Sequence, residues 1–521
     1  MQIFKGAIVT CDQGGAVYQY LVEDGGRIIF VGDELPEPWS SQGNIVDLGE
    51  KALLPAFGDG HIHFSSWALF NATFDLRLAT TLAEVGALIQ AYALRERGDK
   101  VLLGFGHSAH SVAEQRLITR AEIDAFVQEK PVYVVCYDGH SAIANSAMLS
   151  LLPQKVCAQH GFDRASGILR HEAFLAATDV VSSTVSPLRL AKNMLLGMDT
   201  LADFGVGLVH TVEGVGFPRD LDVDLVRFLG KSSQLQFRIY FQTMQINKVI
   251  RRKLPRVGGC FACALDGCFG VKDAALFAPY SDDPHNRGIL FYSDQQVNDF
   301  ARAANRAGLQ IQLHCIGDAA VVQAVNAIEQ ALLDFPRSDH RHTLIHACLT
   351  PEDMMEKIAK LGIVITLQPG FLVSPLEPFS YLERILGERI NNFSPYKKMQ
   401  EYGIVISGGS DAPVVAPDPI AGIHGVCNHF LPEQSLDTAT ALRLFTYNVA
   451  YTTFDERERG SLERGKIADM VVLNRNPLTL APSDLLELKV EKLLIGGQEY
   501  RKGQTLLGAL AAGFKNRNRV V

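Results

Sequence analysis

The chain has 521 residues, of which 47% are hydrophobic and 20% are charged, and its formal net charge is −8. This length exceeds the roughly 250–300 residues at which one hydrophobic core usually stops growing, so more than one structural unit is expected. The composition is that of an ordinary globular protein and excludes a disordered chain. A negative net charge without a basic cluster argues against a nucleic-acid partner, because phosphate binding needs grouped lysine and arginine side chains.

The sequence shows no targeting or membrane signal. Its start, MQIFKGAIVTCDQGG, lacks a basic segment followed by a long apolar stretch, and no apolar run reaches about 18 residues. The nine cysteines are an odd number and widely scattered, which favours reduced thiols over a disulfide framework. We therefore expect a cytoplasmic protein with a small-molecule substrate and no membrane partner. Assembly into a homo-oligomer is left open.

The two ends of the chain have the pattern of small β-structures. Residues 1–55 alternate in the β manner between Gly and Asp turns, and residues 461–521 contain similar segments such as KIADMVVLNRN. Because chain ends often lie close together, we expect both ends to form one small β-sandwich domain.

Two histidines, His61 and His63, follow the apolar run KALLPAF of residues 51–57. Side chains two residues apart on a strand share a face, and histidine is the commonest metal ligand. The pair could therefore hold an ion together. Alone it is equally compatible with structural histidines that bond to backbone groups, so further ligands must be sought.

Seven more β-type runs follow this first one, at residues 205–214, 235–243, 259–267, 309–318, 342–350, 362–370 and 403–413. Helical patterns, with apolar residues every three or four positions, lie between several of them, as at 293–308 and 319–335. Near-continuous apolar strands that alternate with helices predict a parallel sheet buried on both faces. Eight such units over residues 56–460 predict an α/β fold, a (β/α)8 TIM-like barrel. Residues 65–200 would be an insertion after strand one that covers the substrate.

Three polar residues sit at the ends of later strands, as the histidine pair does at the end of the first: His314, His346 and Asp411. Catalytic groups of such barrels gather at the carboxyl ends of the strands. Four imidazoles and one carboxylate form a ligand set that suits Zn²⁺ or a similar divalent ion. Their shared position favours a metal site over five separate structural roles.

The segments LLPAFGDGHIHF, LHCIGDAA, HTLIHACLT, TLQP, LGER, GGSDAPV and GSLERGKIADMVVL follow one another in this order. Together they resemble the amidohydrolase superfamily, specifically the amidohydrolase-3 branch with the YtcJ-like proteins and N-substituted formamide deformylase. The resemblance implies a metal-dependent hydrolase that cleaves a carbon–nitrogen bond, other than a peptide bond, in a small molecule. The implied cofactor is a divalent metal, Zn²⁺ first, as one or two ions.

The resemblance also implies roles for the five residues. His61, His63 and Asp411 would hold one ion, while His314 and His346 would serve a second ion or the substrate. A metal ion lowers the pKa of bound water towards about 7, and Asp411 would take a proton from that water and pass it to the leaving nitrogen. If His346 is not a ligand, it would stabilise the developing oxyanion.

One departure from the family pattern concerns strand four. Binuclear members carry there a carboxylated lysine that bridges two ions, four residues before an Asp; counting back from Asp266 reaches Ala262, and Lys272 comes too late. We therefore expect no metal ligand from strand four and a second ion, if any, that binds more weakly. The alternative function is then a mononuclear deaminase or a cyclic amide or imidazolone hydrolase. Glu213 or Cys263 could take the place of the bridging lysine, although Cys263, at an odd distance from Ala262, has the opposite strand parity and would point to the other face of the strand.

Three further residues are candidate substrate contacts. His140 lies in a DGH segment of the insertion, Glu213 follows predicted strand two, and Arg170 could meet a substrate carboxylate.

Overall fold

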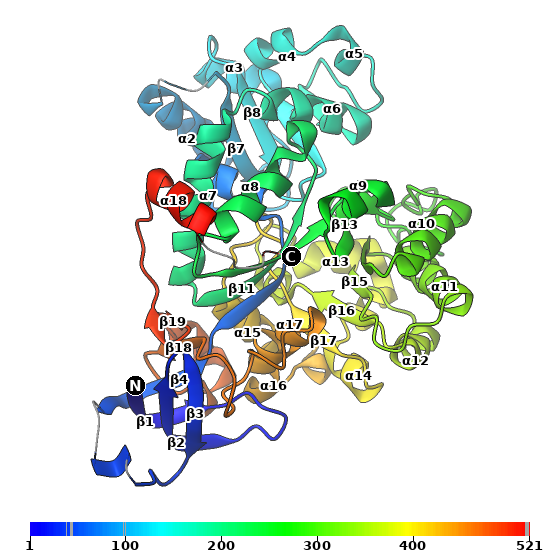
Figure 1. Cartoon of the computed structure of the whole chain (residues 1–521). Coiled ribbons are helices and arrows are strands. Elements are labelled where there is room, and N and C mark those ends of the chain that lie inside the picture. The colour runs from blue at the N-terminus through cyan, green and yellow to red at the C-terminus, as the bar shows by residue number, and fades with distance from the viewer. Residues whose placement is uncertain (38, 42–44, 97, 99, 516–519, 521) are drawn as a thin grey trace.

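The computed structural model describes residues 1–37, 39–41, 45–96, 98, 100–515 and 520. Within these residues the strands form three β-sheets, of seven, five and eight strands. Figure 1 shows the seven-stranded sheet beside the N-terminus at the lower left and the five-stranded sheet at the top, with the eight-stranded sheet between them.

The eight-stranded sheet confirms the predicted barrel, because every pair of neighbouring strands in it is parallel. All eight predicted strands are present. They are β5 (Phe57–Ile62), β11 (Val206–Glu213), β12 (Gln236–Phe241), β13 (Arg256–Ala264), β14 (Gln310–Cys315), β15 (Thr343–His346), β16 (Val364–Leu367) and β17 (Ile406–Gly408). The first and last strands meet beyond their ends, where the Asp411 N–H donates to the His61 carbonyl at 2.7 Å and the His63 N–H to the Ala412 carbonyl at 3.0 Å.

Helices cover the outside of the barrel, as crossover connections between parallel strands require. The main ones are α7 (Pro187–Asp203), α8 (Leu221–Gly230), α9 (Ile246–Arg252), α10 (Asp294–Arg306), α11 (Asp318–Asp334), α12 (Glu352–Leu361), α14 (Tyr396–Glu401), α15 (Pro419–Cys427) and α16 (Thr438–Leu444). Shorter segments and the C-terminal end add α1 (Phe64–Asn71), α13 (Phe379–Leu386), α17 (Tyr447–Thr452) and α18 (Leu506–Lys515). The two helices predicted from periodicity are α10 and α11, and Ser293 with Gln296 forms a capping box at the start of α10.

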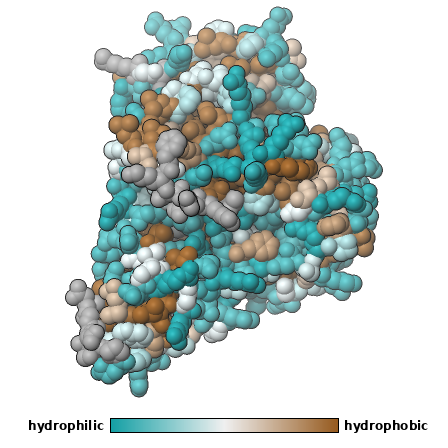
Figure 2. Space-filling view, in the orientation of Figure 1, coloured by the Kyte–Doolittle hydropathy of each residue, from teal (hydrophilic) through white to brown (hydrophobic). Residues whose placement is uncertain are grey.

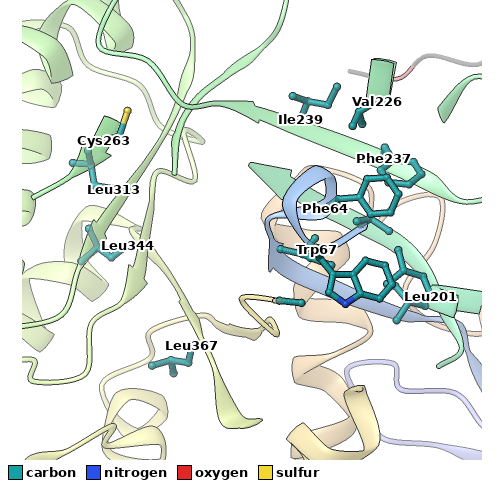
Figure 3. Close-up of a cluster of buried hydrophobic side chains, with 14 of the residues drawn as sticks. Phe64, Trp67, Leu201, Val226, Phe237, Ile239, Cys263, Leu313, Leu344 and Leu367 are labelled. Carbon is teal, nitrogen blue, oxygen red and sulfur yellow. The ribbon is translucent and has the colours of Figure 1, made fainter. Parts of the chain in front are cut away.

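A large hydrophobic cluster fills the layer between these strands and helices. Figure 3 shows Cys263, Leu313 and Leu344 in one part of this cluster and Phe64 and Phe237 in another. Successive side chains of a strand point to opposite faces. Leu313 packs outward under the helices, so its neighbour on β14 points into the barrel, where the candidate site lies.

Strands from both chain ends share the seven-stranded sheet, which confirms that the termini combine. Its hydrogen-bonding order is β20-β19-β18-β4-β1-β2-β3, one continuous sheet. The strands are β1 (Gln2–Val9), β2 (Val17–Asp24), β3 (Arg27–Gly32), β4 (Ile45–Pro55), β18 (Met470–Leu473), β19 (Val490–Ile495) and β20 (Gln498–Glu499). On β18, Met470 and Val472 belong to a small core of this sheet, whereas Val471 and Leu473 join the large cluster. The period-two alternation thus ties the terminal sheet to the barrel.

The segment after β5 folds into a unit with its own sheet, of order β10-β9-β8-β7-β6. Its strands are β6 (Phe74–Asp75), β7 (Leu102–His107), β8 (Val132–Cys136), β9 (Ser141–Ala144) and β10 (Ile168–Arg170). Its helices are α2 (Leu82–Arg95), α3 (Arg120–Phe126), α4 (Ser146–Leu151), α5 (Gln154–Cys157) and α6 (His171–Ser182). A separate hydrophobic cluster that includes Val85, Ile89 and Val134 stabilises this unit, so the predicted insertion is more than a set of loops.

The surface is mixed in character. Figure 2 shows hydrophilic residues over most of one face, with hydrophobic residues gathered in several separate patches. Among the described helices, none combines the length and the apolar character needed to cross a bilayer.

Candidate metal centre

Three of the predicted ligands meet at the carboxyl end of the barrel. His61 lies within β5 and His63 directly precedes α1, and the Nε2 atoms of both lie 3.2 Å from the same oxygen, Oδ1 of Asp411. All three side chains are buried. Contacts with the two imidazoles outweigh burial and hold the pKa of Asp411 well below its ordinary value. The convergence expected from the sequence is therefore present.

A buried carboxyl group, Asp59, holds these ligands in register. Its Oδ1 accepts from the His61 N–H at 3.1 Å and the Ser410 N–H at 2.9 Å, and its Oδ2 accepts from Ser410 Oγ at 2.6 Å. Burial raises the pKa of Asp59 to about 6. The close approach also depends on Gly409, where a Cβ atom would lie 2.6 Å from the His61 nitrogen. Strand one and the segment after strand eight are thereby joined at the ligands.

His314 lies near the end of β14 and His346 at the end of β15. Each has a polar neighbour close to the Nδ1 atom of its ring. Nδ1 of His346 lies 2.6 Å from Gln368 Oε1, and Nδ1 of His314 lies 3.4 Å from Asp266 Oδ1. The contact with Gln368 leaves Nε2 of His346 facing the other ligands, in the way that outer partners orient metal-binding histidines, whereas Nδ1 of His314 has no hydrogen-bond partner among the described residues. Burial lowers the pKa of His314 to about 3 and that of His346 well below its ordinary value, so both rings are neutral and able to donate a lone pair.

Cys260 of β13 also belongs to this group, and sequence reasoning missed it. Its Sγ lies 3.2 Å from Nε2 of His61 and 3.9 Å from Nε2 of His346. One ligand atom from each of Cys260, His61, His346 and Asp411 lies within 4.8 Å of all the others. Counting back from Asp266 to Ala262 did not point to this residue, and the register of β13 against β14 shifts between Gly259 and Ala264.

Several of these residues have a backbone conformation that L-amino acids rarely adopt. Asp411 has φ +56°, His346 has φ +70°, and Phe261, next to Cys260, has φ +45°. Such left-handed values cost free energy and persist only where the surrounding structure enforces them, typically at functional sites. The fold therefore accepts strain at the ends of three barrel strands, where it aims the candidate ligands.

The donor set fits a tetrahedral metal ion. With bonds of about 2.0–2.3 Å and tetrahedral angles, two ligands of one zinc ion lie about 3.3–3.8 Å apart. The contacts of Asp411 with His61 and His63, at 3.2 Å, and those of Cys260, at 3.2 and 3.9 Å, are close to this range. Neutral imidazoles, a carboxylate and a sulfur are donors that zinc prefers.

Two cavities open on this centre and form the arms of one pocket. Six residues line both arms: Asp138, His140, His314, His346, Asp411 and Val414. The insertion arm, of about 90 Å³, is lined by apolar side chains that include Phe70, Phe105, Phe174 and Phe261. The loop arm, of about 60 Å³, is lined by side chains that include Ile316, Phe371, Phe393 and Glu377. Neither arm has a lysine or arginine among its described lining residues.

Carboxyl groups give the loop arm its polar character. Tyr137 donates a hydrogen bond from its hydroxyl to Oε1 of Glu377 at 3.0 Å, and burial raises the pKa of Glu377 to about 7. Tyr137 and Asp138 also line an outer cavity of about 490 Å³ between the insertion and residues 270–273. The outer cavity and the loop arm therefore share these two lining residues.

The structure brings only one of the three predicted substrate contacts to the pocket. His140 lines both arms, with its ring centroid 6.3 Å from that of His314. Arg170 is exposed and lines the outer cavity instead. Glu213 lines neither arm, because its Oε1 accepts hydrogen bonds from the Ser65 N–H and the Thr211 hydroxyl, so it does not supply charge to the centre.

The two other strand-four alternatives also lie away from the centre. Lys272 is paired with Asp282, with Nζ 2.9 Å from Oδ2, which agrees with its exclusion from the sequence. Cys263 is fully buried in the layer beneath the helices (Figure 3), as its strand parity predicted. A signal for Cys260 does exist in the sequence: the adjacent glycines Gly258 and Gly259 are typical of an irregular strand.

Comparison with known proteins gives one family. The model of the amidohydrolase family matches residues 44–500. Among curated proteins, the amidohydrolase YtcJ of Bacillus subtilis (strain 168), so named without an established activity, is 24% identical to this chain. The similarity covers 93% of this chain and 98% of the YtcJ chain. N-substituted formamide deformylase of Arthrobacter pascens is also 24% identical, over 95% of this chain and 97% of its own.

A solved structure shares the architecture of the whole chain. It is that of an uncharacterized metal-dependent hydrolase from Pyrococcus horikoshii OT3, 25% identical, with a TM-score of 0.76. The similarity covers 92% of this chain and 99% of that one.

Proposed function

The chain belongs to the amidohydrolase family, and from this membership we propose that it hydrolyses an amide-type C–N bond of a small, uncharged molecule with one zinc ion. As a family member it is a metal-dependent hydrolase that acts on carbon–nitrogen bonds. One observation supports the proposed zinc-dependent reaction: Nε2 of His61 and Nε2 of His63 each lie 3.2 Å from Oδ1 of Asp411, where the two cavities join.

His61, His63 and Asp411 would hold the ion, with His314 and His346 close enough to complete its surroundings. A divalent ion there supplies two things, a water of lowered pKa and polarisation of the substrate carbonyl. Imidazole donors and the tetrahedral spacing favour zinc over magnesium or calcium, which prefer oxygen ligands.

Asp411 would act as general base and then as general acid. Its carboxylate is ionised, since its pKa lies well below the ordinary value, and it borders both arms. It can therefore accept a proton from the attacking water and pass it to the departing nitrogen. His346, whose Nε2 is aimed at the centre by the bond between Nδ1 and Gln368, would either bind the ion or stabilise the oxyanion.

The pocket favours a substrate with an apolar group on each side of the scissile bond. Both arms are small and lined largely by aromatic and aliphatic side chains. The ionisable groups along them are carboxyl groups and imidazoles, and the described lining residues include no lysine or arginine that could pair with a substrate carboxylate. His140 borders both arms and would contact the bound substrate near the reacting bond.

The experiment is a substrate screen with the purified, zinc-loaded protein. N-substituted formamides and acetamides with apolar substituents are compared with matched analogues that carry a carboxylate, and release of the amine is measured. We expect hydrolysis of the uncharged compounds and at least about 10-fold slower turnover of the charged analogues, with His140→Ala raising KM. Ammonia release from heterocyclic amines instead would identify a deaminase. Protein that binds no metal ion at a near-stoichiometric level would contradict the proposal.

The predicted cytoplasmic location is part of this proposal. All nine cysteines are free thiols in the structure, as expected for a reducing compartment.

A further inference from the structure

Cys260 occupies a position in the barrel that demands an explanation. It is buried, on strand four, and its sulfur faces the same point as His61 and His346. A thiol that merely packs in a core has apolar neighbours, as Cys263 has three residues later. Here the nearest partners of the sulfur are two imidazole nitrogens and a carboxylate.

The backbone around Cys260 has an unusual conformation at three residues. Gly258 and Gly259 have φ +115° and +123°, and Phe261 has φ +45°. A Cβ atom would lie 1.8 Å from the Gln312 carbonyl oxygen at Gly258 and 2.7 Å from Val212 Cγ1 at Gly259. Side chains at these glycines would disrupt the segment, which inserts extra residues opposite β14. Bulges are common next to active sites, and in this one the sulfur of Cys260 faces the ligands while Cys263 is buried in the core.

The charge of the site supports a role for the sulfur. Asp411 is the carboxylate among the four clustered donors, and the described lining residues of the two arms include no lysine that could be carboxylated. A thiolate would add the second negative charge needed to balance a dication in a buried site. It would bind at about 2.3 Å, and its softness favours zinc, cadmium and cobalt over manganese and magnesium.

From these observations we infer that Cys260 is a ligand of the metal ion, a thiolate contributed by strand four. It takes the part of the coordination shell next to His61 and His346 and completes a sulfur, nitrogen and oxygen set around one ion. The inference rests on the proposed function only in that an ion binds at this centre. It reverses the expectation that strand four contributes no ligand.

X-ray absorption at the zinc edge tests the inference directly. Full-length protein loaded with one equivalent of zinc should show one sulfur scatterer at about 2.3 Å. Protein loaded with cobalt should show a thiolate-to-cobalt charge-transfer band in the near ultraviolet. Both signals should disappear in Cys260→Ser and Cys260→Ala. Zinc affinity should fall by at least about 100-fold, since even second-shell substitutions cost about 10- to 100-fold.

Two matched variants serve as controls. Cys263→Ser changes a buried cysteine on the same strand, and Cys348→Ser changes the cysteine that lines the loop arm. Both should keep the sulfur signal. Circular dichroism and thermal unfolding of each apo protein separate loss of a ligand from loss of the fold, and the wild-type spectrum decides the question even if a Cys260 variant fails to fold.

The outcomes distinguish this inference from the proposed function. Stoichiometric zinc with only nitrogen and oxygen scatterers would overturn the role of Cys260 and leave the hydrolase proposal intact. Sulfur scattering that persists in both Cys260 variants would also overturn it. Failure to bind zinc or cobalt at all, together with no hydrolysis of any amide, would overturn the proposed function itself.

Discussion

Two buried polar clusters lie in the same barrel and are organised in opposite ways. The first is the ligand cluster of His61, His63, Cys260, His346 and Asp411 at the carboxyl ends of the strands. The second, which we call the base cluster, lies nearer the amino ends and consists of His210, Arg238, Arg256, Thr453 and Asp455. Arg256 opens β13, the strand that carries Cys260 further along.

The base cluster pairs its groups with one another. Arg238 donates from Nε to Asp455 Oδ2 at 2.8 Å and makes a second contact through a terminal nitrogen, so the ion pair is bidentate. The Thr453 hydroxyl joins His210 Nε2 at 2.9 Å to Asp455 Oδ2 at 2.8 Å. Burial lowers the pKa of His210 to about 3, which keeps this ring neutral.

The ligand cluster instead turns its lone pairs towards one common point. Asp411 Oδ1 faces the imidazole nitrogens of His61 and His63 at 3.2 Å, and the sulfur of Cys260 faces those of His61 and His346. Burial of polar groups thus serves stability where donors match acceptors, and function where acceptors gather around a place for a cation. Four substitutions or treatments should separate the two roles.

The largest effect is expected from Asp411→Asn. Asparagine keeps the shape and an oxygen atom but cannot take a proton, so kcat on an identified amide should fall by at least about 10²- to 10⁴-fold. Because Asp411 is also a proposed metal ligand, zinc should bind more weakly, so kcat is measured with excess zinc, and the free energy of unfolding of the metal-free protein should change little. Asp418→Asn is the matched control, because Asp418 caps α15 and asparagine caps equally well. If Asp411→Asn retained more than a tenth of wild-type activity, Asp411 would not be the base.

The second effect belongs to the base cluster. Arg238→Met leaves Asp455 buried without its cation, so the free energy of unfolding should fall by about 3–5 kcal/mol, measured by urea denaturation. Zinc bound per folded molecule should stay the same. In the control, Arg306→Met removes an exposed ion pair with Asp334 and should cost less than about 1 kcal/mol. Loss of zinc in Arg238→Met would show that the clusters are coupled.

Removal of the metal should abolish activity through the ligand cluster and leave the base cluster unchanged. Dialysis against a chelator should abolish hydrolysis, and zinc should restore it. At a free zinc concentration 100 times the Kd, the ion should stabilise the fold by about 2.7 kcal/mol, seen as a higher urea midpoint. The same increment is expected in Arg238→Met, because distant sites contribute independently. Full activity in metal-free protein would contradict the assignment of the cluster.

The smallest effect concerns Glu213, whose buried carboxyl group interacts with that of Asp222. Burial raises the pKa of Asp222 to about 6 and that of Glu213 well above its ordinary value. The folded pair therefore holds a proton that the unfolded chain releases above about pH 4, and wild-type stability should decline as the pH rises through about 6.

In Glu213→Gln the amide replaces the protonated acid, so this decline should be smaller. We expect the variant to gain on the order of 1 kcal/mol relative to wild type between pH 5 and pH 8, followed by thermal unfolding. Its zinc content and kcat should equal those of wild type. A loss of either would return Glu213 to the site, as the sequence had suggested.

The barrel and most of its site could be predicted because their signals are local. Apolar runs that alternate with helical periodicity defined all eight strands, and the strand-end positions of His61, His314, His346 and Asp411 followed from the rule that parallel strands share one carboxyl edge. Glu213 also ends a strand, yet its carboxyl group bonds to Ser65 and Thr211 instead of facing the pocket. Strand-end position alone does not fix the direction of a side chain.

Sequence patterns alone were enough to predict the number and order of the barrel strands, the union of the two chain ends, and the meeting of His61, His63 and Asp411. The place of Cys260 among the ligands, by contrast, could be seen only in the folded chain. Counting back four residues from Asp266 assumes the spacing of the family pattern, whereas β13 inserts extra residues against β14 between Gly259 and Ala264. That bulge depends on how closely Gly258 and Gly259 approach Gln312 and Val212, contacts between neighbouring strands that exist only in the folded chain.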